Sequence, residues 1–77
     1  MTLTELKIGE KAIVESISDS DLGKRLMELG VLPGEEIKVE FVAPLGDPIA
    51  VSVSGCQLSL RKSDAEHIIC SISKPDR

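Results

Sequence analysis

The chain has 77 residues, a formal net charge of −4 and a single aromatic side chain, Phe41. A domain of this size has a thin core, which Val, Ile and Leu must fill here, and this composition favours β-strands. The negative charge and the lack of stacking rings argue against a nucleic-acid partner, and no apolar run is long enough to span a bilayer, so direct membrane insertion is not expected.

The first predicted elements are a turn and a strand. Residues 4–8 form a helical turn or a loop, and a strand follows over residues 11–17. Three consecutive apolar residues, 12–14, interrupt its alternation, which indicates either burial on both faces or a β-bulge. Residues 18–21 read Ser-Asp-Ser-Asp and are therefore candidate caps for a following helix.

The next segment has the pattern of a short amphipathic helix. Three leucines recur at helical spacing and form an apolar stripe that we expect in the core: Leu22, Leu26 and Leu29. The charged residues between them can face water: Lys24, Arg25 and Glu28. Gly23 weakens this helix by about 1 kcal/mol relative to alanine, so packing must compensate.

The end of this helix is encoded in five residues. Gly30 can close the helix in the left-handed conformation, and Val31 and Leu32 can then pack back against the leucine stripe. Pro33 presets the first central position of a β-turn and Gly34 accepts a positive φ at the second. We therefore expect a sharp turn into a strand that starts near residue 35.

Four further strands are predicted from alternating apolar residues. Their inward-facing side chains are Ile37, Val39 and Phe41, then Ile49, Val51 and Val53, then Leu58 and Leu60, and finally Ile68, Cys70 and Ile72. A loop restricted by Pro44 and Pro48 separates the first two of these strands, and Gly55-Cys56 connects the next two as a hairpin.

A capping box and a polar tail complete the chain. Residues 63–66 read Ser-Asp-Ala-Glu, which predicts a single helical turn over residues 64–67. The polar residues 74–77 are expected to fray, which leaves residues 1–73 as one domain.

These elements predict a mainly β protein, a small barrel of about five strands. One short α-helix is inserted after the first strand, and a helical turn precedes the last. Closure would pair the sheet edges that a thin open sheet exposes. The alternative on pattern alone is a small α+β sheet with the helix on one face.

Four motifs, in order and at matching spacing, make residues 3–72 resemble the FeoA family, the small cytoplasmic component of the bacterial ferrous-iron uptake system. They are Leu3-x-x-Leu6 followed by Gly9, then Arg25-Leu26-x-x-Leu29-Gly30-Val31-x-Pro33-Gly34, then Pro44-Leu45-Gly46-Asp47-Pro48-Ile49, and finally Leu58-x-Leu60-Arg61-Lys62-x-x-Ala65-x-x-Ile68. The resemblance implies an SH3-like barrel, the domain type found at the C-terminus of iron-dependent repressors, here without a DNA-binding segment.

The resemblance also implies an accessory role without enzymatic activity or a cofactor. The protein would bind the cytoplasmic part of FeoB, a membrane transporter with a GTPase domain, and through it lie at the inner face of the membrane. Stimulation of that GTPase through Arg25 or Arg61 is a refinement of this hypothesis. The alternative is a metal-binding or metal-sensing regulator that carries Fe²⁺ or another transition metal. Homo-oligomer formation and the direction of any regulatory effect are left open.

Six residues are candidates for partner contact, because they are charged or fall off the leucine stripe: Lys24, Arg25, Met27, Leu32, Asp47 and Arg61. Met27 and Leu32 beside the two cations have the composition of a modest protein-binding patch. Arg25 and Arg61 could instead fix loop geometry by pairing with nearby carboxylates. Other motif residues are interpreted as structural: Leu26, Leu29, Gly30, Pro33, Gly34, Pro48 and Leu60.

His67 and Cys70 are the candidate metal ligands, three residues apart with two acids nearby. Strand alternation places Cys70 on the face of Ile68 and Ile72 and His67 on the other, so we interpret Cys70 as a buried apolar thiol and predict no metal site. Cys56 and Cys70 are both predicted to be free thiols, because nothing indicates an oxidising compartment.

Overall fold

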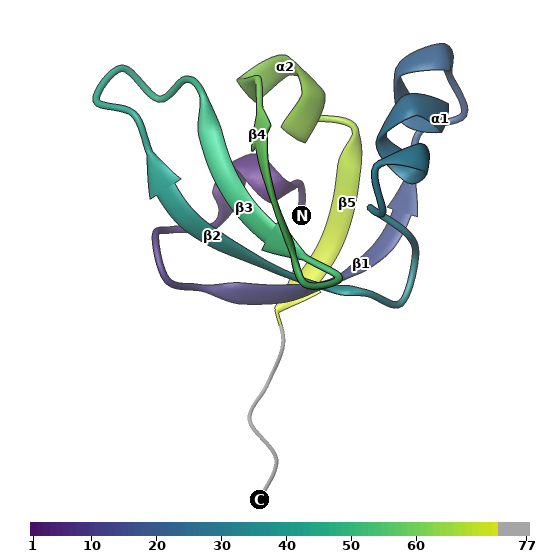
Figure 1. Ribbon diagram of the computed structural model, residues 1–77, viewed down its shortest axis with the longest axis horizontal. Coiled ribbons are helices and arrows are strands. Elements are labelled where there is room, and N and C mark those ends of the chain that lie inside the picture. The colour runs from purple at the N-terminus through teal and green to yellow at the C-terminus, as the bar shows by residue number, and fades with distance from the viewer. Residues whose placement is uncertain (73–77) are drawn as a thin grey trace, which may run out of the picture.

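The computed structural model describes residues 1–72 as one strongly bent antiparallel sheet with three short helices (Figure 1). The elements, in chain order, are the 3-10 helix η1 (Leu3–Glu5), β1 (Lys11–Ile17), α1 (Asp21–Glu28), β2 (Glu36–Val42), β3 (Ile49–Val53), β4 (Cys56–Leu60), α2 (Lys62–Ala65) and β5 (Ile68–Ile72). This order confirms the predicted five strands, with a helix after the first and a helical turn before the last. The predicted tail 74–77 lies outside the described residues.

The sheet is open. Its strand order is β4-β3-β2-β1-β5, so β4 and β5 are its two edges, and within residues 1–72 no ladder joins them. The predicted closure by strand pairing is therefore wrong. The N-terminal segment covers β5 instead: the Cys70 N–H donates to the Met1 carbonyl oxygen at 2.8 Å, and Thr2 forms a bridge with Ile69.

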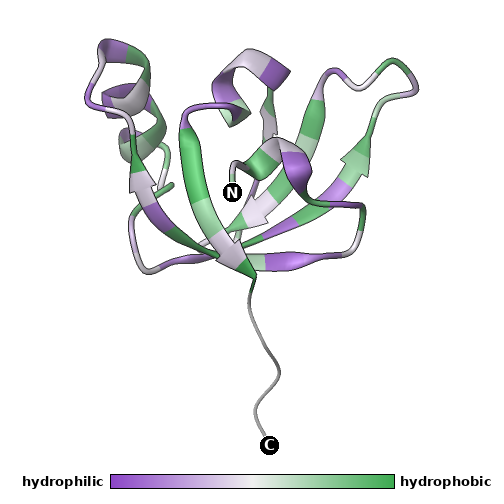
Figure 2. Ribbon diagram, turned by 180° about the vertical axis from the view of Figure 1, so that it is seen from behind, coloured by the Kyte–Doolittle hydropathy of each residue, from purple (hydrophilic) through white to green (hydrophobic). Residues whose placement is uncertain are grey.

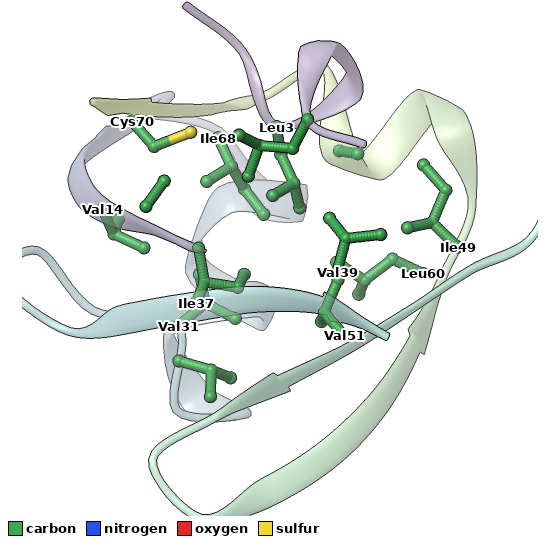
Figure 3. Close-up of a cluster of buried hydrophobic side chains, with 14 of the residues drawn as sticks. Leu3, Val14, Val31, Ile37, Val39, Ile49, Val51, Leu60, Ile68 and Cys70 are labelled. Carbon is green, nitrogen blue, oxygen red and sulfur yellow. The ribbon is translucent and has the colours of Figure 1, made fainter. Parts of the chain in front are cut away.

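The bent sheet encloses a small core of aliphatic side chains (Figure 3). Its fully buried members of largest volume are Leu3, Val14, Val31, Ile37, Val39, Val51, Val53, Ile68 and Cys70. Hydrophobic and hydrophilic residues alternate along the strands in Figure 2, as expected for a sheet with one buried face. The core thus has the Val, Ile and Leu composition that the sequence predicted.

Two bulges decide which residues face the core. The pairing of β1 with β5 shifts between Val14 and Ser16, so β1 does contain a bulge, although it follows residues 12–14, where Ala12 and Val14 are buried and Ile13 is half-buried. In β2 a second shift lies between Val39 and Phe41. The extra residue rotates the end of the strand, because side chains alternate with period two. Phe41 is consequently 56% exposed, which corrects its predicted inward position, and Val42 packs against the core instead.

Helix α1 begins and ends as the sequence indicated, with one exception. The Ser20 hydroxyl caps it by accepting the Gly23 N–H at 3.1 Å. At the other end Gly30 has φ 106°, and the Val31 N–H donates to the Leu26 carbonyl at 3.1 Å, which is the pairing of a Schellman motif. This turn carries Val31 into the core. Leu29, predicted to be buried, is 48% exposed.

The turn after α1 confirms its prediction. The Glu35 N–H donates to the Leu32 carbonyl at 3.1 Å, and Gly34 between them has φ 93°. The hairpin between β3 and β4 differs from its prediction. Ser54 and Gly55 both have positive φ and make a two-residue turn, so Cys56 is the first residue of β4.

Helix α2 and the end of β5 also require corrections. The α2 helix begins two residues earlier than predicted, because its N-cap is Arg61 and the Asp64 carboxylate accepts the Arg61 N–H at 3.1 Å. The capping-box acid is therefore Asp64 rather than Glu66. Ile72, predicted to face inward, is 46% exposed at the end of β5.

Gly23 has a packing role that composition alone does not reveal. A Cβ atom at this position would collide with the carbonyl oxygen of Ser18 and press on Ile17, because α1 crosses the preceding backbone closely. The lack of a side chain thus permits the helix to lie against the end of β1. The helix propensity lost at Gly23 is the cost of this close approach.

We predict that Gly23→Ala destabilises the protein by about 1–3 kcal/mol, the range for overpacking a close contact, although alanine is the better helix former. Urea unfolding measures the difference. Lys24→Ala on the exposed face of α1 is the matched control and should stay within about 0.5 kcal/mol of the unchanged chain. A Gly23→Ala variant that is equally stable or more stable would contradict the packing role.

Both cysteines are free thiols, as predicted, with Cys56 exposed and Cys70 buried. Burial raises the pKa of the Cys70 thiol, and nearby carboxylates raise it further against the lowering effect of the N-terminal ammonium. The folded protein therefore retains a proton on this group at pH values where the unfolded chain releases it.

This difference predicts a loss of stability at alkaline pH. The contribution of Cys70 is fully present below its unfolded pKa of about 8.5 and declines as the pH rises through that value toward the folded pKa. Urea unfolding under reducing conditions at several pH values measures the decline. Cys70→Ala, although less stable at neutral pH, should lack the part of the decline that belongs to this thiol. Parallel pH profiles for the two proteins would contradict the prediction.

Candidate functional site

The first candidate surface is formed by the flank of α1 that carries Met27 and by the turn that follows the helix. Met27 is 41% exposed and Leu32 39% exposed, as their position off the leucine stripe predicted, and the Lys24 side chain beside them is exposed too. We call these three residues the helix-exit patch. It places two large apolar side chains in water, which marks a candidate contact surface on a small domain. Contact of this patch with a partner stays a prediction.

The second surface is a groove between α1 and β4 that the sequence did not indicate. Its volume is about 190 Å³, and its lining residues are Leu22, Arg25, Leu26, Leu29, Ser59, Leu60 and Asp64. The buried side chains of Leu26 and Leu60 form part of its lining, whereas Leu29 is half exposed. We call this feature the α1–β4 groove. No local pattern could predict it, because its two walls lie about thirty residues apart in the chain.

The arginines predicted for partner contact lie at different places. Arg25 lines the α1–β4 groove, and within residues 1–72 its guanidinium forms neither an ion pair nor a hydrogen bond. The alternative structural role, pairing with a nearby carboxylate, is therefore not observed for Arg25. Arg61 acts through its backbone, since its N–H and carbonyl both take part in the cap of α2. Its side chain is exposed.

Asp47, a further candidate for partner contact, is bonded within the chain. Its carboxylate accepts the Lys62 N–H at 3.0 Å, so the loop between Pro44 and Pro48 is fastened to the first turn of α2. Together with Asp64, it satisfies two N–H groups that a helix start leaves without partners. This hydrogen bond gives Asp47 a structural role. Contact of Asp47 with a partner stays a prediction.

The candidate metal ligands are not brought together. The Cys70 side chain lies in the core at 1% exposure (Figure 3), whereas His67 Nδ1 lies 2.7 Å from the hydroxyl oxygen of Ser18. This hydrogen bond joins α2 to the segment that caps α1. Across residues 1–72, no group of three or more His, Cys, Asp or Glu side chains is placed to hold a metal ion.

A larger hollow of about 340 Å³ is lined by residues of β1, β2 and β3 and by the turn between β3 and β4. Lys11 and Lys38, which are cross-strand neighbours, contribute to its lining together with Glu36. Lys38 Nζ also lies 3.8 Å from a carboxylate oxygen of Glu40. Because carboxylates accompany both lysines, the hollow does not present the uniform positive charge that would select an anion.

The chain resembles proteins of one family over its described length. Residues 1–72 match the FeoA domain. A fusion of Fe(2+) transport protein A with the Fe(2+) transporter FeoB from Porphyromonas gingivalis is 35% identical over 69 residues, which are 88% of this chain and 8% of that protein. The chain thus spans only a small part of this relative. In the described part of the chain, no helix is long and apolar enough to cross a membrane.

Solved structures agree with the family match. The FeoA protein of Chlorobium tepidum is 42% identical with a TM-score of 0.88, over 100% of this chain and 74% of that chain. FeoA of Stenotrophomonas maltophilia is 34% identical with a TM-score of 0.82, over 92% of this chain and 89% of that chain. That protein was crystallised with zinc and is described as a prokaryotic SH3 domain protein. A manganese-dependent transcriptional repressor shares the fold at 21% identity and a TM-score of 0.85, over 95% of this chain and 36% of that chain.

The SH3-like fold is therefore confirmed, and part of a manganese-dependent transcriptional repressor shares this fold. The domain match along residues 1–72 and the two FeoA structures show that the chain belongs to the FeoA family, whose small SH3-like accessory domains are associated with ferrous-iron transport.

Proposed function

We propose that this protein is a non-enzymatic accessory component of ferrous-iron uptake that binds the cytoplasmic GTPase domain of a FeoB-type transporter. The main support for this proposal is the P. gingivalis relative, because a FeoA part and a FeoB part share one polypeptide in that protein. Domains that are fused in one species and separate in another commonly act together. Binding to the transporter would hold the protein at the inner face of the membrane.

The surface of the domain supports a binding role. Apolar side chains of the helix-exit patch lie in water beside Lys24, and Arg25 has no partner within the described residues. Exposing large apolar groups lowers solubility unless a partner covers them, so such groups on a small domain favour an interface. We therefore assign the first contact with the transporter to α1 and its exit turn.

Metal binding is the second candidate, and the zinc found with the S. maltophilia relative motivates it. In this chain His67 is engaged with Ser18 and Cys70 is buried, so the two predicted ligands do not share a site. An exposed single ligand gives weak binding of a transition metal at most. The geometry accordingly favours the interaction module.

We predict that the double variant Met27→Asp and Leu32→Asp binds the isolated GTPase domain at least tenfold more weakly than the unchanged chain, because interface anchors contribute about 1–2 kcal/mol each. Isothermal titration calorimetry with the FeoB-type protein of the same organism measures the affinity. Both residues are exposed, so the fold should persist, and circular dichroism checks this.

The matched control is Ile8→Asp with Leu45→Asp. These residues are also exposed and apolar, and the change in charge is the same, but they lie in loops at the other end of β2. The control should bind like the unchanged chain. Equal binding by both double variants would exclude the helix-exit patch, and no binding by the unchanged chain would contradict the proposed association itself.

A further inference from the structure

The two edge strands of the sheet differ in whether another segment of the chain pairs with them. The N-terminal segment covers β5 through the hydrogen bond from Cys70 to Met1 and the bridge between Thr2 and Ile69. β4 pairs with β3 on one side only (Figure 1), and within the described residues no segment pairs with its other side. An uncovered edge presents backbone donors and acceptors that can accept another strand.

The pairing register of the β3–β4 hairpin shows which backbone N–H and C=O groups of β4 do not bond to β3. Ser54 and Gly55 form a two-residue turn, so the pair Val53–Cys56 that closes it exchanges hydrogen bonds, and such pairs alternate along the ladder. The N–H and C=O groups of Gln57 and Ser59 consequently point away from β3. Across residues 1–72 these groups have no other hydrogen-bond partner.

The β4 strand itself contains none of the charges, prolines or bulges that block strand addition. Residues 56–60 read Cys-Gln-Leu-Ser-Leu, without lysine or proline, and their pairing with β3 has no bulge. Natural proteins use charges, prolines and bulges to protect exposed edges from unwanted pairing. β4 therefore has no such protection in its own sequence, and α1 borders it across the α1–β4 groove.

The α1–β4 groove lies along the same edge and supplies side-chain contacts. Ser59 of β4 lines it together with the half-exposed Leu29 and the unpaired Arg25 of α1. The Ser54 hydroxyl donates to a Glu35 carboxylate oxygen at 2.9 Å and lies 3.3 Å from the Gly30 carbonyl oxygen, so the turn before β4 is held close to the segment that follows α1. A strand at this edge would therefore meet an apolar wall and a cation.

We propose that an extended segment of the transporter's cytoplasmic domain adds to β4 as a sixth strand, with a carboxylate facing Arg25 and an apolar side chain against Leu29. The inference rests on the proposed association and names the mode of binding. Arg25 favours a single carboxylate opposite it, because its guanidinium has no ion pair within residues 1–72, whereas the charged Asp64 carboxylate in the same groove disfavours further acidic residues in the added segment. A second copy fits less well, since its β4 strand contains no acidic residue.

Ser59→Pro tests the backbone contact. Proline removes the outward N–H of Ser59, whereas the ladder to β3 uses Cys56, Leu58 and Leu60 and stays intact, as is usual for proline on an edge strand. The variant should bind the GTPase domain at least tenfold more weakly in calorimetry. Ser59→Ala retains the N–H and loses only the groove contact of the hydroxyl, so it should bind at least fivefold more tightly than Ser59→Pro. Equal affinity of both variants would overturn the proposal.

Arg25→Glu tests the charged contact in the same titration. It should weaken binding at least tenfold, whereas Lys7→Glu, an equal change of charge at an exposed position outside the groove, should change affinity less than twofold. Equal effects of the two substitutions would overturn the assignment of a carboxylate to Arg25.

Hydrogen exchange on the unchanged chain gives a measurement that does not depend on a variant's folding. The amide hydrogens of Gln57 and Ser59 should exchange quickly in the free protein and become protected when the GTPase domain is added. Protection without the partner, together with a dimer in light scattering, would show that a second copy occupies the edge and would overturn the proposal. If the unchanged chain binds but these amides stay unprotected, strand addition fails while the association stands. If it does not bind at all, the association fails and strand addition fails with it.

Discussion

The structure depends on the packing of α1 and its exit turn into an open sheet. Leu26 and Val31 are buried, and the hydrogen bond from the Val31 N–H to the Leu26 carbonyl fixes one relative to the other. A sheet whose edge strands do not pair cannot enclose a core by itself. Leu26 and Val31 contribute to the enclosure together with Leu3 and Leu6 of the N-terminal segment and Ala65 of α2, and the thin core of a small domain leaves few others to replace them.

This way of enclosing the core determines which surfaces stay uncovered. Gly23 lets one side of α1 approach the end of β1 closely, and Leu26 occupies the core side. Two flanks are then exposed, one with Met27 and one with Leu29. A longer or more apolar helix would cover more of the sheet, and the groove beside β4 would be lost. The exposed flanks therefore follow from the helix that the core requires.

Most of the fold could be predicted because its signals are local. Alternation located Ile37 and Val39, and the Gly30 and Pro33-Gly34 signals located the end of α1 and the turn after it. Two errors concern side chains whose exposure depends on tertiary structure. The bulge before Phe41 reverses which side chain is buried at the end of β2, and Leu29 lies in the α1–β4 groove rather than in the core; neither leaves a mark in the spacing of apolar residues.

The candidate site was less predictable, because it depends on contacts between distant segments. Helical spacing predicted the exposure of Met27, but the hydrogen bond that Asp47 accepts from the Lys62 N–H, fifteen residues away, has no signal in the sequence. The α1–β4 groove joins segments that are far apart in the chain, so no motif could indicate it. A sequence also does not indicate which backbone N–H and C=O groups lie unpaired on a sheet edge, since almost every residue has such groups.

The small size of these surfaces agrees with the arrangement in the P. gingivalis relative. A patch of three residues and one strand edge bury much less area than a stable complex between free proteins usually needs. In the fusion protein the two parts share one chain. A flexible linker between two binding modules gives an effective concentration of about millimolar, at which modest surfaces suffice. Under the proposed association of separate proteins, both surfaces would have to act together. The helix-exit patch and the groove lie on the two flanks of one helix, so a single partner that wraps α1 can engage both, and the second contact then forms as an intramolecular step.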